Sequence, residues 1–252
     1  MKEVSKINML EVECVDKDVL LLKPSEQIGT PKLTQALNEL LTPMHLGSLA
    51  LRWKFMPKPQ QGNGRPVMLI PGYGTGETSM RFIKKYLTAL GYDTYNWGLG
   101  KNHGNARKLL PLIDNKVKLL SEEYQQPVSL IGWSWGGFLA REIARDEPEI
   151  IRQVITLGSP VIGGPKYTIL GHIEEFFGYH VQEIENEISN RFQNEIKSPI
   201  IAIYSKKDGV VAWQACIDEW SHSVLHVEMR NISHCGLVCS PEVLVRIGEH
   251  LK

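Results

Sequence analysis

The stretch Gly132-Trp133-Ser134-Trp135-Gly136 places a serine where a strand is expected to pass directly into a helix. The apolar run 127–131 before it, bounded by a proline, is typical of a short buried strand. The residues after it, 137–145, carry apolar side chains at helical spacing and charged side chains on the opposite face. The serine must therefore adopt a strained turn, and glycines are needed two positions to either side, where the turn leaves no room for a side chain.

This context predicts an exposed nucleophile. The turn pushes the hydroxyl of Ser134 out of the end of the sheet, beside helix N-terminal N–H groups that can stabilise an oxyanion. A Gly-x-Ser-x-Gly pattern alone arises by chance in a glycine-rich chain, and the alternative is a serine that only caps a helix. A base and an acid at the positions such a fold requires would favour the nucleophile.

Composition narrows the class of protein. The 252 residues can form one large domain with a substantial core, and 42% hydrophobic and 22% charged residues are ordinary for a soluble globular protein. Lys plus Arg and Asp plus Glu number 28 each, so no net field favours nucleic acid or an anionic membrane. We expect no nucleic-acid partner and no integral membrane segment, because no window approaches about 18 consecutive apolar residues.

The expected location is cytoplasmic. The first ten residues mix charges and lack the apolar core of a secretory signal. Four cysteines in a chain of this length do not make a disulfide framework, and reduced thiols are the expectation.

Residues 1–66 differ from the rest and are expected to be a helical N-terminal prelude packed on the main domain. A helix is predicted over 30–41, with a proline in its first turn and leucines at helical spacing. We expect Pro43 to stop this helix and a second short helix to cover 46–53. The polar, proline- and glycine-rich stretch 57–66 is typical of a link.

From residue 67 to 252 the pattern alternates between short apolar strands and helices. Strands are expected at 67–70, 93–97, 128–131, 153–157, 199–204 and 224–229, and helices at 79–90, 106–124, 137–145 and 241–251. Ser240 is the expected N-cap of the last helix. This alternation indicates an α/β domain with a mostly parallel central sheet and helices on both faces. Ligands of such sheets bind at the carboxyl ends of the strands.

The segment 163–197 is longer than a plain crossover needs and is rich in aromatic and aliphatic residues, including Phe176 and Phe177. We interpret it as a helical cap inserted over the site, since long insertions in compact domains are usually lids or binding loops. One ordinary crossover helix with a long approach remains the alternative.

A nucleophilic serine needs a base, and the base needs an orienting carboxylate; in this kind of fold the acid and then the histidine follow the serine along the chain. Asp208 occurs in the loop after the strand 199–204. The pair Asp208-Gly209 is also good turn chemistry. Asp218 is the competing acid, but it lies further on and is expected within a helix.

The candidate base is His234, which falls in the loop between the last strand and the final helix. The other histidines are less suitable: His226 lies inside the strand, His222 precedes it at the wrong end of the sheet, and His250 is in the closing helix. A serine, an aspartate and a histidine thus each follow a separate predicted strand, and this coincidence strongly favours a catalytic role for the three side chains.

The oxyanion hole needs a second backbone N–H beside that of Trp135. The glycine-rich loop 70–76 follows the first strand of the main domain. Within it, the N–H of Tyr73 is the candidate donor, with Gly74 next. A phosphate-binding role for this loop is less favoured, because it lacks the endings of the P-loop and dinucleotide motifs.

Taken in order, Pro71-Gly72-Tyr73-Gly74, the Gly132–Gly136 stretch, Asp208 and His234 resemble the α/β-hydrolase superfamily, and the stretches 91–100 and 156–160 resemble its lipase-like and esterase-like members. The resemblance covers about residues 67–252. It implies a Ser134–His234–Asp208 triad with Tyr73 and Trp135 as oxyanion donors. Many lipases have His-Gly before the oxyanion residue, where this chain has Pro71-Gly72.

We therefore predict a serine hydrolase that cleaves carboxylic esters of small-molecule or lipid-like substrates, with no cofactor and no metal, because no residue cluster has metal-ligand spacing. Acyl transfer or thioester hydrolysis on the same triad is the related alternative, and a catalytically idle binding protein is the alternative from another class. The expected substrate contacts are Gly72, Gly74, Trp133, Phe176 and Phe177. One of Trp133 and Trp135 is expected in the core and the other at the acyl site. The oligomeric state is not determined by the sequence.

Overall fold

The computed structural model describes residues 28–31, 33–169, 194–219, 221 and 223–252. Within these ranges six strands form one sheet in the order β2-β1-β3-β4-β5-β6, and every neighbouring pair is parallel. The strands are β1 (Pro66–Ile70), β2 (Asp93–Asn96), β3 (Val128–Trp133), β4 (Ile151–Leu157), β5 (Ile200–Tyr204) and β6 (Val224–Glu228). The predicted sheet is confirmed, and each predicted strand is present with small shifts at its ends.

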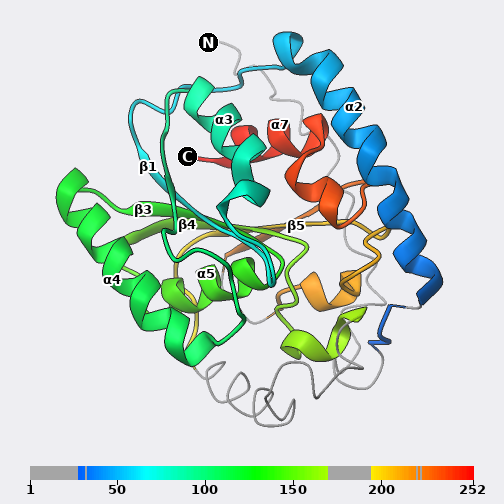
Figure 1. Cartoon of the computed structure of the whole chain (residues 1–252). Helices are drawn as coiled ribbons and strands as arrows, with labels where there is room; N and C mark the ends of the chain where they lie inside the picture. The colour runs from blue at the N-terminus through cyan, green and yellow to red at the C-terminus, as the bar shows by residue number, and fades with distance from the viewer. Residues whose placement is uncertain (1–27, 32, 170–193, 220, 222) are drawn as a thin grey trace, which may run out of the picture.

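Helices cover both faces of this sheet, as Figure 1 shows, with α3 and α7 on one face and α4 and α5 on the other. Their bounds are α3 (Arg81–Ala89), α4 (Ala106–Tyr124), α5 (Trp135–Asp146) and α7 (Pro241–His250). Short 3-10 turns complete the domain: η3 (Glu77–Met80), η4 (Gly164–Tyr167), η7 (Trp213–Cys216) and η8 (Cys235–Val238). Ser240 stands at the N-cap of α7 as predicted, but its hydroxyl bonds the Glu242 carboxylate and makes no cap hydrogen bond.

The N-terminal segment is continuous where a break was expected. It consists of η1 (Leu33–Leu41), α2 (Thr42–Arg52) and η2 (Trp53–Phe55), so the prediction that Pro43 stops the first helix is wrong. Pro43 lies in the first turn of α2, where a proline loses no helical hydrogen bond, and it therefore begins the helix. The division of the chain at residue 66 stays a prediction.

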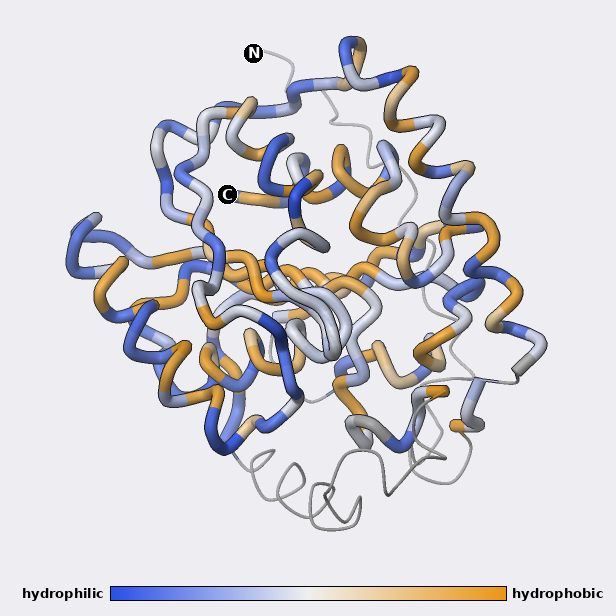
Figure 2. The backbone as a smooth tube through the Cα atoms, viewed as in Figure 1, coloured by the Kyte–Doolittle hydropathy of each residue, from blue (hydrophilic) through white to orange (hydrophobic). Residues whose placement is uncertain are grey.

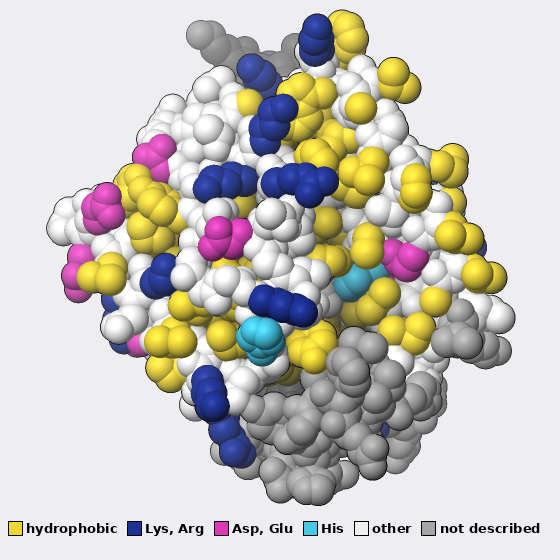
Figure 3. Space-filling view, in the orientation of Figure 1, with side chains coloured by type: hydrophobic (Ala, Val, Ile, Leu, Met, Phe, Trp, Pro, Cys, Tyr) yellow, Lys and Arg dark blue, Asp and Glu magenta, His cyan; other side chains and the backbone are white. Residues whose placement is uncertain are grey.

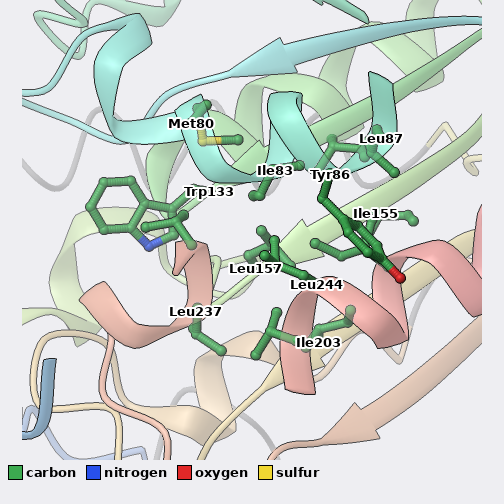
Figure 4. Close-up of a cluster of buried hydrophobic side chains, with 14 of the residues drawn as sticks. Met80, Ile83, Tyr86, Leu87, Trp133, Ile155, Leu157, Ile203, Leu237 and Leu244 are labelled. Carbon is green, nitrogen blue, oxygen red and sulfur yellow. The ribbon is translucent and has the colours of Figure 1, made fainter. Parts of the chain in front are cut away.

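Strand alternation separates two apolar cores. In β1, Val67 and Leu69 face the core shared with α3 and α7, whereas Met68 and Ile70 face the core shared with α4 and α5. Apolar segments gather at the centre of the molecule in Figure 2. The first core is drawn in Figure 4, where Leu87, Ile155 and Leu244 meet from α3, the sheet and α7.

The outer side of the N-terminal segment is apolar. Five large hydrophobic side chains are exposed there: Leu37, Leu40, Met44, Leu51 and Phe55. Figure 3 shows hydrophobic side chains along the edge that α2 occupies. No helix in the described ranges is both long and apolar enough to cross a membrane.

The predicted cap falls largely outside the described residues. Only its ends, 163–169 and 194–197, belong to the described part, and Phe176 and Phe177 lie outside it. The alternatives for the segment 163–197 are therefore unchanged.

We expect the substitution Leu87→Ala to lower the free energy of unfolding by about 2–5 kcal/mol, because the fully buried side chain leaves a cavity in the first core. Leu51→Ala removes the same atoms from an 81% exposed position and should change it by less than about 0.5 kcal/mol. Urea unfolding of both variants measures the difference. Equal effects would contradict the assignment of this core.

Candidate active site

Ser134 lies between the last residue of β3 and the first residue of α5. Its backbone has φ 54° and ψ −127°, a conformation that is costly for a residue with a side chain. The predicted strained turn is therefore confirmed, and the serine hydroxyl is held at the carboxyl end of the sheet beside the N-terminus of α5.

The glycines on either side of Ser134 are required by close backbone contacts. A Cβ on Gly132 would lie 2.3 Å from the carbonyl oxygen of Gly136. A Cβ on Gly136 would lie 2.3 Å from the carbonyl oxygen of Ile70 and 2.5 Å from that of Pro71. No side chain fits at these distances, so Gly136 allows the turn to approach the end of β1 and Gly132 allows the end of β3 to lie against the first turn of α5.

The loop after β1 lies against the serine. A Cβ on Gly72 would stand 3.2 Å from the Cβ of Ser134 and 3.0 Å from the indole of Trp133. The loop thus reaches the serine, as an oxyanion-binding loop must. Tyr73, the candidate donor, is half-buried there.

Asn102 fixes this loop, and the sequence analysis did not identify it. The fully buried side chain of Asn102 donates to the carbonyl of Pro71 at 2.8 Å, and its backbone N–H donates to the carbonyl of Thr75 at 2.8 Å. The N–H of Gly74 donates to the Asn102 carbonyl at 2.8 Å. Gly74 is therefore already hydrogen-bonded, which argues against it as the second candidate for an oxyanion donor.

Asp208 and His234 are paired. The Nδ1 atom of His234 lies 2.6 Å from Oδ2 of Asp208, and both side chains are buried. The other carboxylate oxygen of Asp208 accepts hydrogen bonds from the N–H groups of Val210 and Val211, each at 2.8 Å. The loop after β5 therefore fixes the carboxylate, which in turn fixes the orientation of the imidazole.

The charge around the imidazole favours its protonated form. Burial of His234 lowers its pKa, but the carboxylates of Asp208 and Glu39 outweigh burial and leave the pKa above its ordinary value. Asp208 bonds Nδ1 of the ring and Glu39 bonds the backbone N–H of His234, so two negative charges adjoin this residue and are suited to stabilise an imidazolium.

The competing acid, Asp218, has a different partner. It lies in irregular structure after η7, not in a helix as expected, and its carboxylate forms a buried ion pair with Arg141. Its backbone N–H donates to Nε2 of His226 at 2.9 Å. Burial lowers the pKa of His226, which lies inside β6 as predicted. Among the two acids, only Asp208 contacts His234.

The serine and the acid–base pair meet around the end of β4. The N–H of Ser134 donates to the carbonyl of Leu157 at 2.8 Å. A Cβ on the next residue, Gly158, would lie 2.8 Å from Oδ2 of Asp208 and 3.1 Å from Nδ1 of His234. No hydrogen bond joins the Ser134 hydroxyl to His234 within the described residues, and such contacts are often long until substrate is bound.

The two tryptophans beside the serine are both buried. The indole N–H of Trp133 donates to the carbonyl of His234 at 3.2 Å, and the two rings have centroids 5.2 Å apart. Trp135 stacks on Phe138 and donates to the carbonyl of Gly104 at 3.0 Å. Their roles in the acyl site stay predictions.

Glu39 is the functional candidate that sequence reasoning missed. Its carboxylate accepts hydrogen bonds from the backbone N–H groups of His234 at 2.8 Å, Cys235 at 2.9 Å and Gly209 at 3.2 Å. No local motif identifies a helical glutamate that bonds N–H groups 170–196 residues further along the chain.

Cys235, next to the histidine, is a protonated thiol, because burial raises its pKa to about 12. No group of three or more His, Cys, Asp or Glu side chains in the described ranges could hold a metal ion.

The sequence matches no protein-family model and no curated protein, but many solved structures share this fold. A structure from work on the metagenome-derived lipolytic enzymes LipS and LipT has a TM-score of 0.57 and 17% identity over 76% of this chain and 96% of its own. A serine hydrolase homologue from Coxiella burnetii has a TM-score of 0.52 and 21% identity over 76% of this chain and 88% of its own. The Pyrococcus furiosus esterase Pf2001 has a TM-score of 0.54 and 20% identity over 75% of this chain and 82% of its own.

At these identities the likeness concerns the fold alone. The parallel sheet, the turn at Ser134 and the similar structures establish that this chain has the α/β-hydrolase fold, as the sequence predicted.

We expect Gly158→Ala to lower the free energy of unfolding more than Gly100→Ala. Both glycines have positive φ, at +54° and +72°, but only at position 158 would the new methyl group meet Asp208, His234 and Leu237. Gly158→Ala should also lower the pKa of His234, because it pushes the carboxylate away from the imidazole. Urea unfolding and NMR titration of the histidine ring measure the two effects, and equal results for both variants would contradict this packing.

Proposed function

We propose that this protein is a serine hydrolase that cleaves carboxylic esters through an acyl-enzyme on Ser134. The single observation that carries the proposal is the buried hydrogen bond between His234 and Asp208, at the carboxyl end of the sheet where Ser134 occupies its strained turn. Acyl transfer to serine requires a base, a carboxylate that orients the base and a serine hydroxyl, and all three groups lie at this end of the sheet.

In the proposed reaction, Oγ of Ser134 attacks the acyl carbonyl while Nε2 of His234 takes its proton. Asp208 accepts a hydrogen bond from the Nδ1–H group and so fixes the tautomer that leaves Nε2 as the base. The imidazolium then returns its proton to the leaving alkoxide. Water attacks the acyl-enzyme in the second half of the reaction, again with His234 as the base.

The negative charge that forms on the substrate oxygen needs donors. Trp135 is the first residue of α5, so its N–H has no partner within the helix and lies at the positive end of the helix dipole. Tyr73, in the loop that approaches Ser134, is the proposed second donor. The hydrogen bonds of Asn102 to Pro71 and Thr75 would keep that loop in place during the reaction.

We infer an apolar acyl group in the substrate. The similar structures include proteins named as esterases and lipolytic enzymes, and the segment 163–197 is rich in apolar residues. Gly72, Gly74, Trp133, Phe176 and Phe177 are the proposed substrate contacts. A screen of p-nitrophenyl esters of graded acyl length, with and without an added alcohol as acceptor, would define the acyl pocket and separate hydrolysis from acyl transfer.

Ser134→Ala should abolish both ester cleavage and labelling by a fluorophosphonate, with a loss of activity of about four orders of magnitude or more. Ser121→Ala, on α4, serves as the matched control and should leave both unchanged. The measurements are p-nitrophenyl ester hydrolysis and in-gel labelling. Continued labelling of the Ser134 variant would remove this serine from the proposed role.

The rate should depend on pH through His234. Because the base acts in its neutral form and its pKa is raised, kcat/KM should fall as the pH drops through a midpoint above the ordinary value of 6.5. Asp208→Asn removes the first of the two carboxylates that raise this pKa, so its midpoint should move to lower pH, whereas Asp218→Asn should not move it. A midpoint at or below 6.5 in the unsubstituted protein would contradict the assignment of the base.

A further inference from the structure

We propose that Glu39 is a positioning residue for the reaction. In this proposal η1 and α2, which lie outside the predicted hydrolase domain, support the active-site loops. This inference rests on the proposed function. In it, the carboxylate of Glu39 holds the loops of His234 and Asp208 in the arrangement that proton transfer from Ser134 requires.

The contacts are specific to the two loops that carry the acid and the base. One carboxylate oxygen of Glu39 accepts from the N–H of His234 at 2.8 Å and from that of Gly209 at 3.2 Å. The other oxygen accepts from the N–H of Cys235 at 2.9 Å. Hydrogen bonds to an ionised carboxylate are about twice as strong as neutral ones. One side chain therefore joins the loop after β5 to the loop after β6.

The backbone of η1 lies close enough to the acid loop to make this contact because residue 209 is a glycine. A Cβ on Gly209 would lie 2.4 Å from the carbonyl oxygen of Gln35 and 3.0 Å from Cα of Ala36. Any side chain at position 209 would force η1 outward. The Glu39 carboxylate would then lose its reach to the N–H groups.

A second contact holds the histidine loop from α2. The hydroxyl of Thr42, at the start of this helix, lies 2.9 Å from that of Ser233, and the latter also accepts from the N–H of Gly236 at 3.1 Å. His45 packs against Gly236, where a Cβ would lie 2.7 Å from its ring. The N-terminal segment thus contacts the loop before, at and after His234.

Charge gives Glu39 an effect that packing alone lacks. The carboxylates of Asp208 and Glu39 oppose burial and raise the pKa of His234. The other titratable groups that interact with Glu39 in the described ranges are the thiols of Cys235 and Cys239, whose pKa values are raised mainly by burial, and His45, whose pKa burial lowers. Glu39 therefore contributes negative charge to the surroundings of the imidazole, and this contribution can be measured apart from folding.

The experiment compares Glu39→Gln, Glu39→Ala and Glu39→Asp in the full chain, with Glu242→Gln as the matched control. Glu242 forms an ion pair with Arg52 of the same segment and accepts from the Ser240 hydroxyl, but within the described residues no hydrogen bond joins it to Asp208 or His234. We expect Glu39→Gln and Glu39→Ala to lower kcat and the rate of fluorophosphonate labelling by about 10- to 100-fold, because a small misplacement of the base is costly. The KM of a short ester should change less than about two-fold, since Glu39 is not placed at the substrate.

Two further readouts separate positioning from stability. The acid limb of the pH–rate profile should move to lower pH in Glu39→Gln and Glu39→Ala, whereas Glu39→Asp, which keeps the charge, should retain more of the original midpoint. Activity is corrected for the folded fraction measured by unfolding at the assay temperature. A loss that disappears on this correction, with an unchanged pH profile, would overturn the proposal.

The Ser134→Ala variant separates a failure of the proposed function from a failure of the proposed role of Glu39. If it still reacts with the fluorophosphonate, the proposed function fails. If Ser134→Ala abolishes labelling while the Glu39 variants label at the original rate with the original pH profile, the proposed function stands and the role of Glu39 is wrong.

Discussion

Backbone atoms of the turn between β3 and α5 lie against the carbonyl oxygens at the end of β1, closer than any side chain would permit. Gly136 makes this approach possible, Gly132 lets the end of β3 lie against the first turn of α5, and Ser134 between them has a positive φ. The strain is held because β3 is buried between two apolar cores and hydrogen-bonded on both sides. The packing of the sheet thus offsets the cost of the strained turn that holds the Ser134 hydroxyl at the carboxyl end of β3.

The other side of the site is supported differently. His234 and Asp208 lie in loops, and their positions depend on hydrogen bonds that cross long separations in sequence. Trp133 binds the carbonyl of His234 from the sheet, while Glu39 binds its N–H from the N-terminal segment. The peptide groups on both sides of His234 are therefore hydrogen-bonded by two side chains that lie far apart in the sequence.

Periodicity and turn chemistry were sufficient to predict a mostly parallel sheet, the succession of strands and helices along the chain, and the serine turn. The bounds of α4 were obtained from amphipathic spacing alone. The pairing of His234 with Asp208 followed from their places after β6 and β5, whereas Asp218 could be set aside only once its ion pair with Arg141 was visible. Pro43 was misread because a proline that stops one helix and a proline that begins another have the same local sequence.

Glu39 and Asn102 were missed for a common physical reason. Each acts through hydrogen bonds to backbone groups far away in sequence, and backbone groups carry no residue-specific signature. Residue patterns report which side chains share a strand or a helix face. They do not report which peptide N–H a carboxylate or amide will reach after folding.

The thiol of Cys235 has a consequence for chemical labelling. Because burial raises its pKa to about 12, this thiol stays protonated at pH 8, although the sulfur adjoins a histidine. Thiol alkylating reagents therefore have little nucleophile to attack at this position, and oxidation to a sulfenic acid is slowed for the same reason. Fast modification of this neighbourhood by an electrophile is therefore expected at a nucleophile other than the Cys235 thiol, and mapping the adduct to a residue identifies which one.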